Sequence, residues 1–354
     1  MGVTLAGAVV RSWSNTGPLA WLLLPVAALY GALGAVRRAV YRWKWIPSRS
    51  VEACVIVVGN VVAGGAGKTP TVISLVRHLR DQGHRVGVVS RGFGRRNQDC
   101  QAVDAASSVQ DVGDEPLLIQ SVTGVPVFVG RDRWQAARAL LARHAEVEII
   151  VCDDGLQHYG LHRDLEICVF DDRGCGNGLL LPAGPLREPW PRRGVEAAGQ
   201  SEKQLLVLKT SGTTSAGQYR ARRALSSVAK DGQGATVSLA ELNAPGRRPV
   251  LALAGIARPE AFFTMLGESG VVLTKTQALP DHYDFRHFDP AAWRAYQLIC
   301  TEKDAAKLWP VVPDALAVAL EQTMEPAFFA AVEQHIAAWR SRPNVGGLSS
   351  PHGH

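Results

Sequence analysis

The chain contains 354 residues, 47% of them hydrophobic and 20% charged, and its formal net charge is +6. This composition is typical of a folded globular protein and excludes a disordered one. The length predicts one large α/β domain with additions, or two domains. The basic surplus favours an anionic partner: a nucleic acid, a phospholipid surface or a phosphorylated substrate. The 6 cysteines are scattered without a CxxC pair, which argues against a zinc site and predicts a reducing compartment.

The first fifty residues differ from the rest of the chain. No charged side chain occurs from Ser12 to Val36, a stretch long enough to cross a bilayer. Basic residues precede and follow it, a pattern that keeps the following chain on the cytoplasmic side: Arg11, Arg37, Arg38, Arg42, Lys44 and Arg49. Tryptophans cluster around the same stretch, as at a headgroup boundary: Trp13, Trp21, Trp43 and Trp45. We therefore predict a membrane-docking segment over residues 1–50.

Four interpretations of this segment compete: a cleaved signal peptide, a spanning helix, a helix in one leaflet, and a buried helix of a soluble domain. Ala32 to Gly34 resembles a weak cleavage site, but export would separate the nucleotide-dependent machinery inferred below from its nucleotide. The segment has no polar face, which disfavours a surface-lying amphipathic helix. Pro25, Gly31 and Gly34 interrupt it and keep a one-leaflet helix open. A buried helix would leave the flanking basic and tryptophan residues without a role.

After residue 47, short apolar runs alternate with amphipathic stretches. This alternation predicts an α/β fold, a parallel sheet with crossover helices. Together with the glycine-rich loop described below, it predicts a P-loop NTPase-like sheet with helices on both faces. The expected strands are Cys54–Val58, Arg85–Val89, Val125–Val129, Val147–Cys152, Leu165–Phe170, Gln204–Leu208 and Val250–Ala254. The expected helices are Thr69–Asp81, Asp114–Val122, Asp132–His144, Pro259–Gly267 and Phe328–Arg340.

Two irregular stretches suggest the domain organisation. Residues 174–199 are rich in glycine, proline and arginine and break the alternation. Residues 211–234 are polar and rich in small side chains, so we expect them to contain a loop between lobes. We predict a P-loop core lobe over residues 51–203, a second, smaller α/β lobe over 204–342, and a disordered tail over 343–354.

A glycine-rich loop follows the first expected strand. Residues 55–70 read as strand, loop and helix start, in the order that lets backbone N–H groups surround the β- and γ-phosphates of a nucleotide. Lys68 would reach the phosphates, and the Thr69 hydroxyl would bind Mg²⁺. The loop departs from the usual pattern, because Val62 occupies the position of the first glycine. The predicted nucleotide-binding residues are Ala63, Gly64, Gly65, Ala66, Gly67, Lys68, Thr69 and Pro70.

Two carboxylates end the expected strand at Val147–Cys152. Asp153 and Asp154 follow it directly, and Mg²⁺ bound to a nucleotide needs such a carboxylate, directly or through water. Either aspartate could instead cap the next turn, so the sequence does not say which of them is nearer the metal. The predicted metal site comprises Thr69, Asp153, Asp154 and Gln157.

Several short blocks, in the same order, closely resemble tetraacyldisaccharide 4'-kinases. They are Gly59-Asn60, Gly64–Pro70, Ser90–Gly94, Gly113–Pro116, Asp153–His158, Leu181–Glu188 and Thr301–Asp304. The resemblance runs from the N-terminal hydrophobic segment to the last expected helix. It implies two P-loop-like α/β lobes with an N-terminal membrane-docking helix, which phosphorylate the 4' hydroxyl of an acylated glucosamine disaccharide 1-phosphate.

The resemblance also implies ATP and Mg²⁺ as cofactors and a location at the cytoplasmic face of the Gram-negative inner membrane. The expected partners are the lipid substrate and the phospholipid surface. We expect no nucleic acid and no obligate protein partner.

The resemblance assigns the base of the reaction to an Asp–His pair. Asp114 matches the family's catalytic carboxylate and His282 the histidine that supports it, so that together they would draw the proton from the sugar hydroxyl. From the residues alone, Asp114 is also a plausible N-cap, because a helix start follows it. A lone histidine such as His282 is usually structural or solvated.

Further residues are assigned more loosely. Arg91 and Arg133 follow expected strands and fit the family's arginines that clamp phosphate charge. Thr301, Lys303 and Asp304 would help to hold the adenine base, although the same stretch reads as a helix N-cap. Basic residues that could meet the substrate 1-phosphate or anionic lipid are Arg91, Arg95, Arg96, Arg187, Arg192 and Arg193.

The main alternative is a membrane-associated P-loop NTPase with a regulatory or targeting role, because altered glycine-rich loops of this kind occur there too. Such a protein needs no acceptor sugar, whereas Asp114 with His282 suits a hydroxyl acceptor. A nucleic-acid binder would rest on the net charge alone. That charge is concentrated beside the hydrophobic segment, which points to phospholipid instead.

Overall fold

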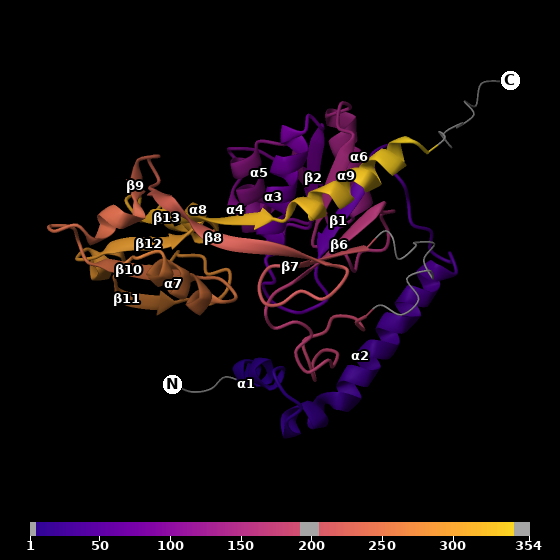
Figure 1. The fold of residues 1–354 in the computed structure, drawn as a ribbon, viewed down its shortest axis with the longest axis horizontal. Coiled ribbons are helices and arrows are strands. Elements are labelled where there is room, and N and C mark those ends of the chain that lie inside the picture. The colour runs from indigo at the N-terminus through magenta and orange to yellow at the C-terminus, as the bar shows by residue number, and fades with distance from the viewer. Residues whose placement is uncertain (1–4, 192–204, 343–354) are drawn as a thin grey trace.

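The computed structural model describes residues 5–191 and 205–342 (Figure 1). The strands are β1 Cys54–Gly59, β2 Val86–Ser90, β3 Gln101–Val103, β4 Val127–Val129, β5 Ile149–Asp153, β6 Leu165–Phe170, β7 Leu205–Lys209, β8 Gln218–Lys230, β9 Thr236–Ser238, β10 Val250–Ala254, β11 Leu273–Ala278, β12 Gln297–Thr301 and β13 Leu316–Met324. The helices are α1 Leu5–Ser12, α2 Pro18–Arg42, α3 Lys68–Asp81, α4 Val109–Val112, α5 Asp114–Thr123, α6 Arg133–Arg143, α7 Pro259–Glu268, α8 Glu302–Leu308 and α9 Pro326–Arg340, with short 3₁₀ helices η3 Leu239–Asn243 and η4 Pro290–Trp293.

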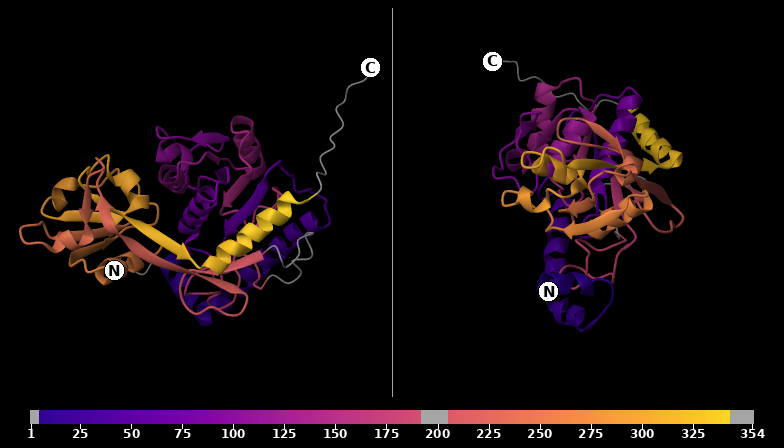
Figure 2. Two further views of the ribbon diagram at one scale, coloured as in Figure 1. Left: turned by 45° about the horizontal axis from the view of Figure 1, so that its top comes forward. Right: turned by 90° about the vertical axis from the view of Figure 1, so that its left-hand side faces the viewer.

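These strands form one mostly parallel sheet in the order β11-β10-β12-β13-β8-β7-β6-β1-β5-β2-β4-β3, with β9 beside β8. We call strands β1–β7 the first half and strands β9–β13 the second half, because β8 runs between them (Figure 2). The pairs β13–β8 and β3–β4 are antiparallel. The α/β fold class predicted from the alternating pattern is confirmed, and the expected strands and helices agree with the observed ones to within two residues at each end.

The first half is buried on both faces of its sheet. Along β1, Cys54, Ile56 and Val58 contribute to a core with α3, α5 and α9, whereas Val55 and Val57 face a second core with α6. Alternate side chains of a strand point to opposite faces, so a strand covered on both faces reads as a continuous apolar run. This is why β1, β2, β5 and β6 are easy to recognise in the sequence.

The stretch 211–234, in which we predicted a loop between lobes, is mostly a strand. Residues 218–230 form β8, a strand whose first residues pair with β7 and whose remainder pairs with β13. Its side chains alternate between half-buried and exposed, so the segment is polar enough to resemble a loop. A half-exposed antiparallel strand carries a much weaker apolar signal than the parallel strands around it.

Two further elements cross the predicted lobe boundary at residue 204. The strand β7 pairs with β6 and so extends the first half. The closing helix α9 buries Phe328, Val332 and Ile336 in the same core as α3. The division into lobes at 51–203 and 204–342 stays a prediction. The predicted tail over 343–354 lies outside the described residues, and so do Arg192 and Arg193.

The second half has its own two cores. One face packs β10 and β12 against α7 and η3, and the other packs the same strands against α8 and the segment 279–296. Phe285, wholly buried on the second face, lies near His282 in the turn that follows β11. This half thus supplies a rigid support for the histidine and for the N-terminus of α8.

The N-terminal helices α1 and α2 lie apart from the sheet (Figure 1). Within α2 only Ala20 and Ala27 are buried, and Leu22 is 75% exposed. The interpretation of α2 as a buried helix of a soluble domain is therefore wrong. The pair is nevertheless attached to the core, because Trp13 Nε1 donates to the Pro182 carbonyl at 3.0 Å and the Tyr30 hydroxyl donates to the Arg187 carbonyl at 2.9 Å.

Candidate active site

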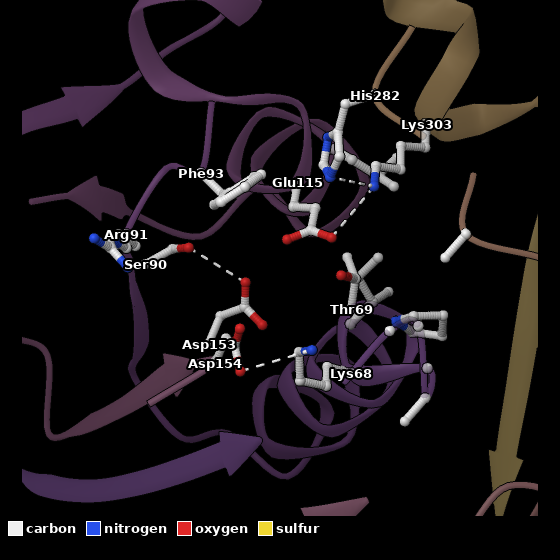
Figure 3. A pocket seen from close by; sticks show the side chains of 18 of the residues that line it. Lys68, Thr69, Ser90, Arg91, Phe93, Glu115, Asp153, Asp154, His282 and Lys303 are labelled. Atoms are coloured by element: carbon white, nitrogen blue, oxygen red, sulfur yellow. Dashed lines mark hydrogen bonds and ion pairs between the residues drawn. The ribbon is translucent and has the colours of Figure 1, made fainter. Parts of the chain in front are cut away.

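A cavity of about 1290 Å³ opens between the two halves, at the carboxyl ends of β1, β2 and β5 (Figure 3). Its floor is the glycine-rich loop, and its far wall carries residues of the second half. Ligands of open α/β sheets bind at this end of the strands. Among the predicted residues, those that line the cavity are Gly64, Gly65, Ala66, Gly67, Lys68, Thr69, Pro70, Arg91, Arg133, Asp153, Asp154, Gln157, His282, Thr301 and Lys303.

The glycine-rich loop leads directly into α3. Gly67 caps the helix with φ +88°, a left-handed conformation that side chains rarely adopt, and Lys68 is the first helical residue. Lys68 Nζ lies 3.3 Å from Asn60 Oδ1 and 3.6 Å from Asp154 Oδ1. The ammonium is thus held over the loop, where the phosphates of a nucleotide would bind.

The start of the loop explains the missing first glycine. Val62 is buried and forms a bridge with Leu186, and the Ala63 amide donates to the Pro185 carbonyl at 2.7 Å. Neither residue lines the cavity. The assignment of Ala63 as a nucleotide ligand is therefore not supported, because its N–H is already bonded to the neighbouring segment.

Asp153 and Asp154 end β5 but have different surroundings. The Asp153 carboxylate is buried and accepts from Ser90 Oγ at 3.2 Å, and its other oxygen has no partner. Burial and the neighbouring carboxylates Glu115 and Asp154 raise the pKa of Asp153 to about 7. For Asp154, burial acts in the same direction but is outweighed by Lys68 and Arg187, so its pKa is lowered.

This donor set fits a magnesium ion. An unpartnered buried carboxylate oxygen, crowded by further carboxylates, is stabilised by a divalent cation. Mg²⁺ in nucleotide sites usually takes one or two carboxylates together with phosphates and waters. Within residues 5–191 and 205–342, no set of three His, Cys, Asp or Glu ligands gathers, so a metal cage made by the protein alone is absent there. Gln157 lines the cavity and its Nε2 donates to Glu188 Oε1 at 2.8 Å, so its place among the metal ligands stays a prediction.

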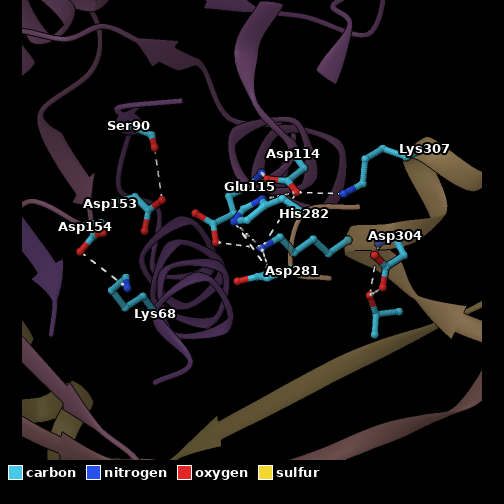
Figure 4. A network of polar contacts seen from close by, with 12 residues as sticks. Lys68, Ser90, Asp114, Glu115, Asp153, Asp154, Asp281, His282, Asp304 and Lys307 are labelled. Carbon is cyan, nitrogen blue, oxygen red and sulfur yellow. Dashed lines mark hydrogen bonds and ion pairs between the residues drawn. The ribbon is translucent and has the colours of Figure 1, made fainter. Parts of the chain in front are cut away.

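Asp114 and His282 come from opposite halves and meet at the far wall (Figure 4). His282 Nδ1 lies 2.9 Å from Asp114 Oδ2, which also accepts from Lys307 Nζ at 3.2 Å. Asp114 is only 4% exposed and does not line the cavity, whereas His282 does. Gly113 is the N-cap of α5 and makes no side-chain bond, but Asp114 Oδ1 accepts from the Glu115 amide at 2.9 Å, so the carboxylate serves both the histidine and the first turn of the helix.

Two lysines, Lys303 and Lys307, lie beside the carboxylates of Asp114 and Glu115 and balance their charge. Burial would raise the pKa of Asp114, but the hydrogen bond from His282 and the charge of Lys303 outweigh it, so this pKa lies well below its usual range. The hydrogen bond to Asp114 raises the pKa of His282 above 6.5, against the effect of burial. Lys303 Nζ lies 3.4 Å from His282 Nε2 and 3.4 Å from Glu115 Oε1.

The predicted arginines occupy different environments. Arg91 is exposed at the rim of the cavity. Arg133 is 3% exposed, and its guanidinium donates to the carbonyls of Gly130, Asp153 and Asp154 at 3.3–3.5 Å. Arg133 therefore fixes the backbone that carries the two aspartates, and its contact with phosphate stays a prediction.

The stretch Thr301–Asp304 begins α8. The Asp304 amide donates to Thr301 Oγ1 at 3.2 Å, and the Asp304 carboxylate accepts from the Gly255 amide at 3.0 Å. Asp304 is wholly buried and lies outside the cavity, so the helix-cap interpretation describes it and its assignment to the adenine site is not supported. Thr301 and Lys303 do line the cavity.

Several residues that line the cavity were not among those predicted from the sequence. Glu115 lies within the recognised Gly113–Pro116 block and could have been found from it. Arg223 belongs to β8, which was interpreted as a loop, and Arg258 precedes α7 without any motif. An apolar surface of the second half also faces the cavity: Leu225, Ile256, Phe262, Met265, Val318 and Leu320.

Comparison with known proteins decides the family. The sequence model of the family described as tetraacyldisaccharide-1-P 4'-kinase, LpxK, matches residues 19–337. The chain belongs to the tetraacyldisaccharide 4'-kinase family. The tetraacyldisaccharide 4'-kinase of Polaromonas naphthalenivorans is 50% identical over 354 residues, covering 98% of each chain. That of Acidovorax ebreus is 50% identical over 339 residues, covering 95% of this chain and 96% of its relative.

The structural comparison agrees. A crystal structure of LpxK from Aquifex aeolicus in complex with ATP superposes with a TM-score of 0.74 at 26% identity, covering 90% of this chain and 99% of that one. The resemblance inferred from the short sequence blocks is thereby confirmed, and the alternative of a regulatory NTPase loses its support. As a member of the tetraacyldisaccharide 4'-kinase family, the chain is expected to use the cavity described above as its active site.

Proposed function

We propose that this chain transfers the γ-phosphate of ATP to the 4' hydroxyl of a tetraacyl glucosamine disaccharide 1-phosphate in lipid A biosynthesis. One observation carries the proposal: a single cavity joins the glycine-rich loop to the Asp114–His282 pair, so that phosphate donor and hydroxyl acceptor can share it. Membership of the family over residues 19–337 supports the same reaction.

The donor end lies over the first half. The loop Gly64–Gly67 receives the β- and γ-phosphates, and Lys68 neutralises their charge. Thr69, Asp153 and Asp154 would hold Mg²⁺, which supplies further neutralisation of the transferred group when bound. Phosphoryl transfer requires mainly positioning and charge stabilisation, which is what these residues offer. The apolar surface that includes Phe262 and Val318 suits the adenine base better than Asp304 does.

The acceptor end is the far wall. His282 Nε2 faces the cavity, while Asp114 holds Nδ1 and thereby the tautomer and orientation of the ring. The imidazole takes the proton of the sugar hydroxyl, and the Asp114 carboxylate stabilises the resulting imidazolium. Lys303, close to Nε2, adds positive charge where the transferred phosphoryl group develops negative charge.

The route of the lipid follows from the N-terminal helix. The cavity extends to Arg37 and Tyr41 of α2, and the apolar face of that helix is exposed. A substrate whose acyl chains remain in the bilayer could therefore present its sugar head to the cavity along α2. We propose that α2 docks the enzyme on the cytoplasmic face of the inner membrane, with the basic residues after it on anionic headgroups.

The reaction is tested with purified enzyme, γ-labelled ATP, Mg²⁺ and the tetraacyl disaccharide 1-phosphate in detergent. We expect a labelled bisphosphorylated lipid. The matched control is the same lipid already phosphorylated at the 4' position, which should accept no label. Hydrolysis of ATP without labelled lipid would instead support the regulatory NTPase.

The pH dependence should report the Asp–His pair. Because the hydrogen bond to Asp114 raises the pKa of His282 above 6.5, the imidazolium persists to higher pH and cannot accept a proton. We therefore expect kcat to fall as the pH drops through this raised pKa and to level off above it. In Asp114→Asn the carboxylate is gone, so the acid limb of the remaining activity should move to lower pH. Profiles at saturating substrates measure this, and identical acid limbs would contradict it.

Membrane docking should depend on the apolar face of α2. Leu22 and Leu29 are 75% and 62% exposed, and placing a glutamate at either should lower partition onto vesicles of phosphatidylethanolamine and phosphatidylglycerol. We expect a decrease of about 10-fold or more per substitution, the effect of losing one buried leucine. Val272, 69% exposed in the second half, gives the control Val272→Glu, which should bind vesicles normally. Co-sedimentation measures all three, and unchanged binding of both leucine variants would reject this surface.

A further inference from the structure

The strand β8 brings a cation, Arg223, to the glycine-rich loop. Arg223 pairs with Gln322 of β13 across the antiparallel ladder, in the part of the sheet that joins the two halves (Figure 2). Its side chain lines the cavity beside Gly67. No motif in the sequence marked this residue.

Arg223 contacts the loop through its backbone. The guanidinium Nη2 donates to the Ala66 carbonyl at 2.6 Å, and Nε donates to Gln322 Oε1 at 3.2 Å. Gln322 Nε2 donates in turn to Thr71 Oγ1 at 2.7 Å, and that hydroxyl donates to the Gly67 carbonyl at 2.9 Å. The carbonyls of Ala66 and Gly67 are thus connected by side chains to β8 and β13.

The fit between the loop and the guanidinium is close. A Cβ atom at position 67 would clash with the Arg223 guanidinium and force it to move, whereas glycine leaves the guanidinium in place. Gln322 and Thr71 are buried, so the bond between them is shielded from water. Burial lowers the pKa of Arg223 to about 10, and the guanidinium remains charged at neutral pH.

The direction of the Ala66 carbonyl matters for a phosphate site. A phosphate loop binds its anion with N–H groups, and a carbonyl turned inward would repel it. A charged donor bonded to that carbonyl fixes its direction and stabilises the loop conformation in which the amides face the cavity.

We propose that Arg223 is a positioning residue for the phosphate loop: it holds the Ala66 carbonyl away from the bound phosphates and, through Gln322 and Thr71, ties the loop conformation to β8 and β13. The inference rests on the proposed nucleotide site. It concerns the affinity for nucleotide, because Arg223 acts on the loop and has no contact with Asp114 or His282 among the described interactions.

The first test compares Arg223→Gln with Arg222→Gln. Arg222 is the neighbouring residue on the exposed face of the strand and serves as the matched control. We expect Arg223→Gln to raise the KM for ATP about 10-fold to 100-fold, the size of a lost charge-assisted hydrogen bond, with little change in the KM for the lipid. A wild-type KM for ATP, or equal increases for both substrates, would overturn the proposal.

A second test addresses folding. Gln322→Leu keeps the side-chain volume but loses both bonds of the relay, and it should raise the KM for ATP in the same direction as Arg223→Gln. In Arg223→Ala, added guanidinium at millimolar concentration should restore part of the ATP affinity, which a general loss of folding would not allow. Absence of both effects would reject the positioning role.

Parallel assays of Lys68→Met distinguish a failure of the role of Arg223 from a failure of the proposed phosphate site. If Lys68→Met is inactive while Arg223→Gln behaves as wild type, the inference fails and the proposed function stands. If Lys68→Met retains full activity, the proposed phosphate site itself is wrong.

Discussion

Replacing Lys68 by methionine is expected to lower kcat/KM by at least about 10³-fold, as is typical when a cation that stabilises transferred phosphoryl charge is removed. Methionine has nearly the same length, so the loop and α3 should keep their shape. The ammonium that lies 3.6 Å from Asp154 and above the loop disappears, and with it the positive charge that the first residue of α3 offers to the phosphates. Steady-state kinetics with labelled ATP and the lipid acceptor measure the loss.

A matched lysine gives the control for this variant. Lys275 is exposed on β11, at the edge of the second half, and Lys275→Met should retain wild-type activity. A Lys68→Met enzyme within about 10-fold of the wild type would fall far short of the loss expected for a phosphate-binding cation and would contradict the role of Lys68.

Replacing Asp114 by alanine should lower kcat by about 10²-fold to 10⁴-fold, the usual contribution of general-base catalysis, because His282 loses the group that orients it, and the KM for ATP should change little. Asp114 lies behind His282 and outside the cavity, so its loss does not remove a nucleotide contact. It frees the imidazole to rotate and removes the hydrogen bond that raises its pKa. Separate determination of kcat and of both KM values tests this division.

The same change also affects stability, because Lys307 is buried and would lose its hydrogen bond to Asp114. The thermal unfolding temperature should therefore be measured beside the kinetics. His282→Gln, which leaves Lys307 paired with Asp114, should lose activity to a similar extent without that decrease. The double variant should be no worse than either single one, since residues that act as a unit are not additive. Full turnover in Asp114→Ala would refute the pair.

The residues that carry the donor site could be predicted because their signals are local. A buried parallel strand, a glycine-rich turn and a helix start follow one another directly over residues 54–81, and two carboxylates end another apolar strand. The family resemblance supplied the Asp114–His282 pair, which no local pattern could have joined across 168 positions. Their direct hydrogen bond is the strongest agreement between sequence and structure.

The remaining features depend on pairing between distant segments. The strand β8 looks like a loop until β7 and β13 are placed beside it, and α9 belongs to the first half only because its apolar face meets the core around α3. Ala63 and Asp304 fit their motifs, but their polar groups bond to the backbones of Pro185 and Gly255. A motif indicates which residue type is present and not which neighbour occupies its hydrogen bonds.

The attachment of α2 to the core has a practical consequence for work with this enzyme. Tyr30 holds the backbone of Arg187, and the Arg187 side chain lies 3.1 Å from Asp154 at the proposed metal site. Removing α1 and α2 to obtain a more soluble preparation would therefore remove a support of the candidate active site as well as the exposed apolar surface of α2. A shortened enzyme that turns over slowly would report this lost support, and full-length protein in bilayer discs is the better starting material.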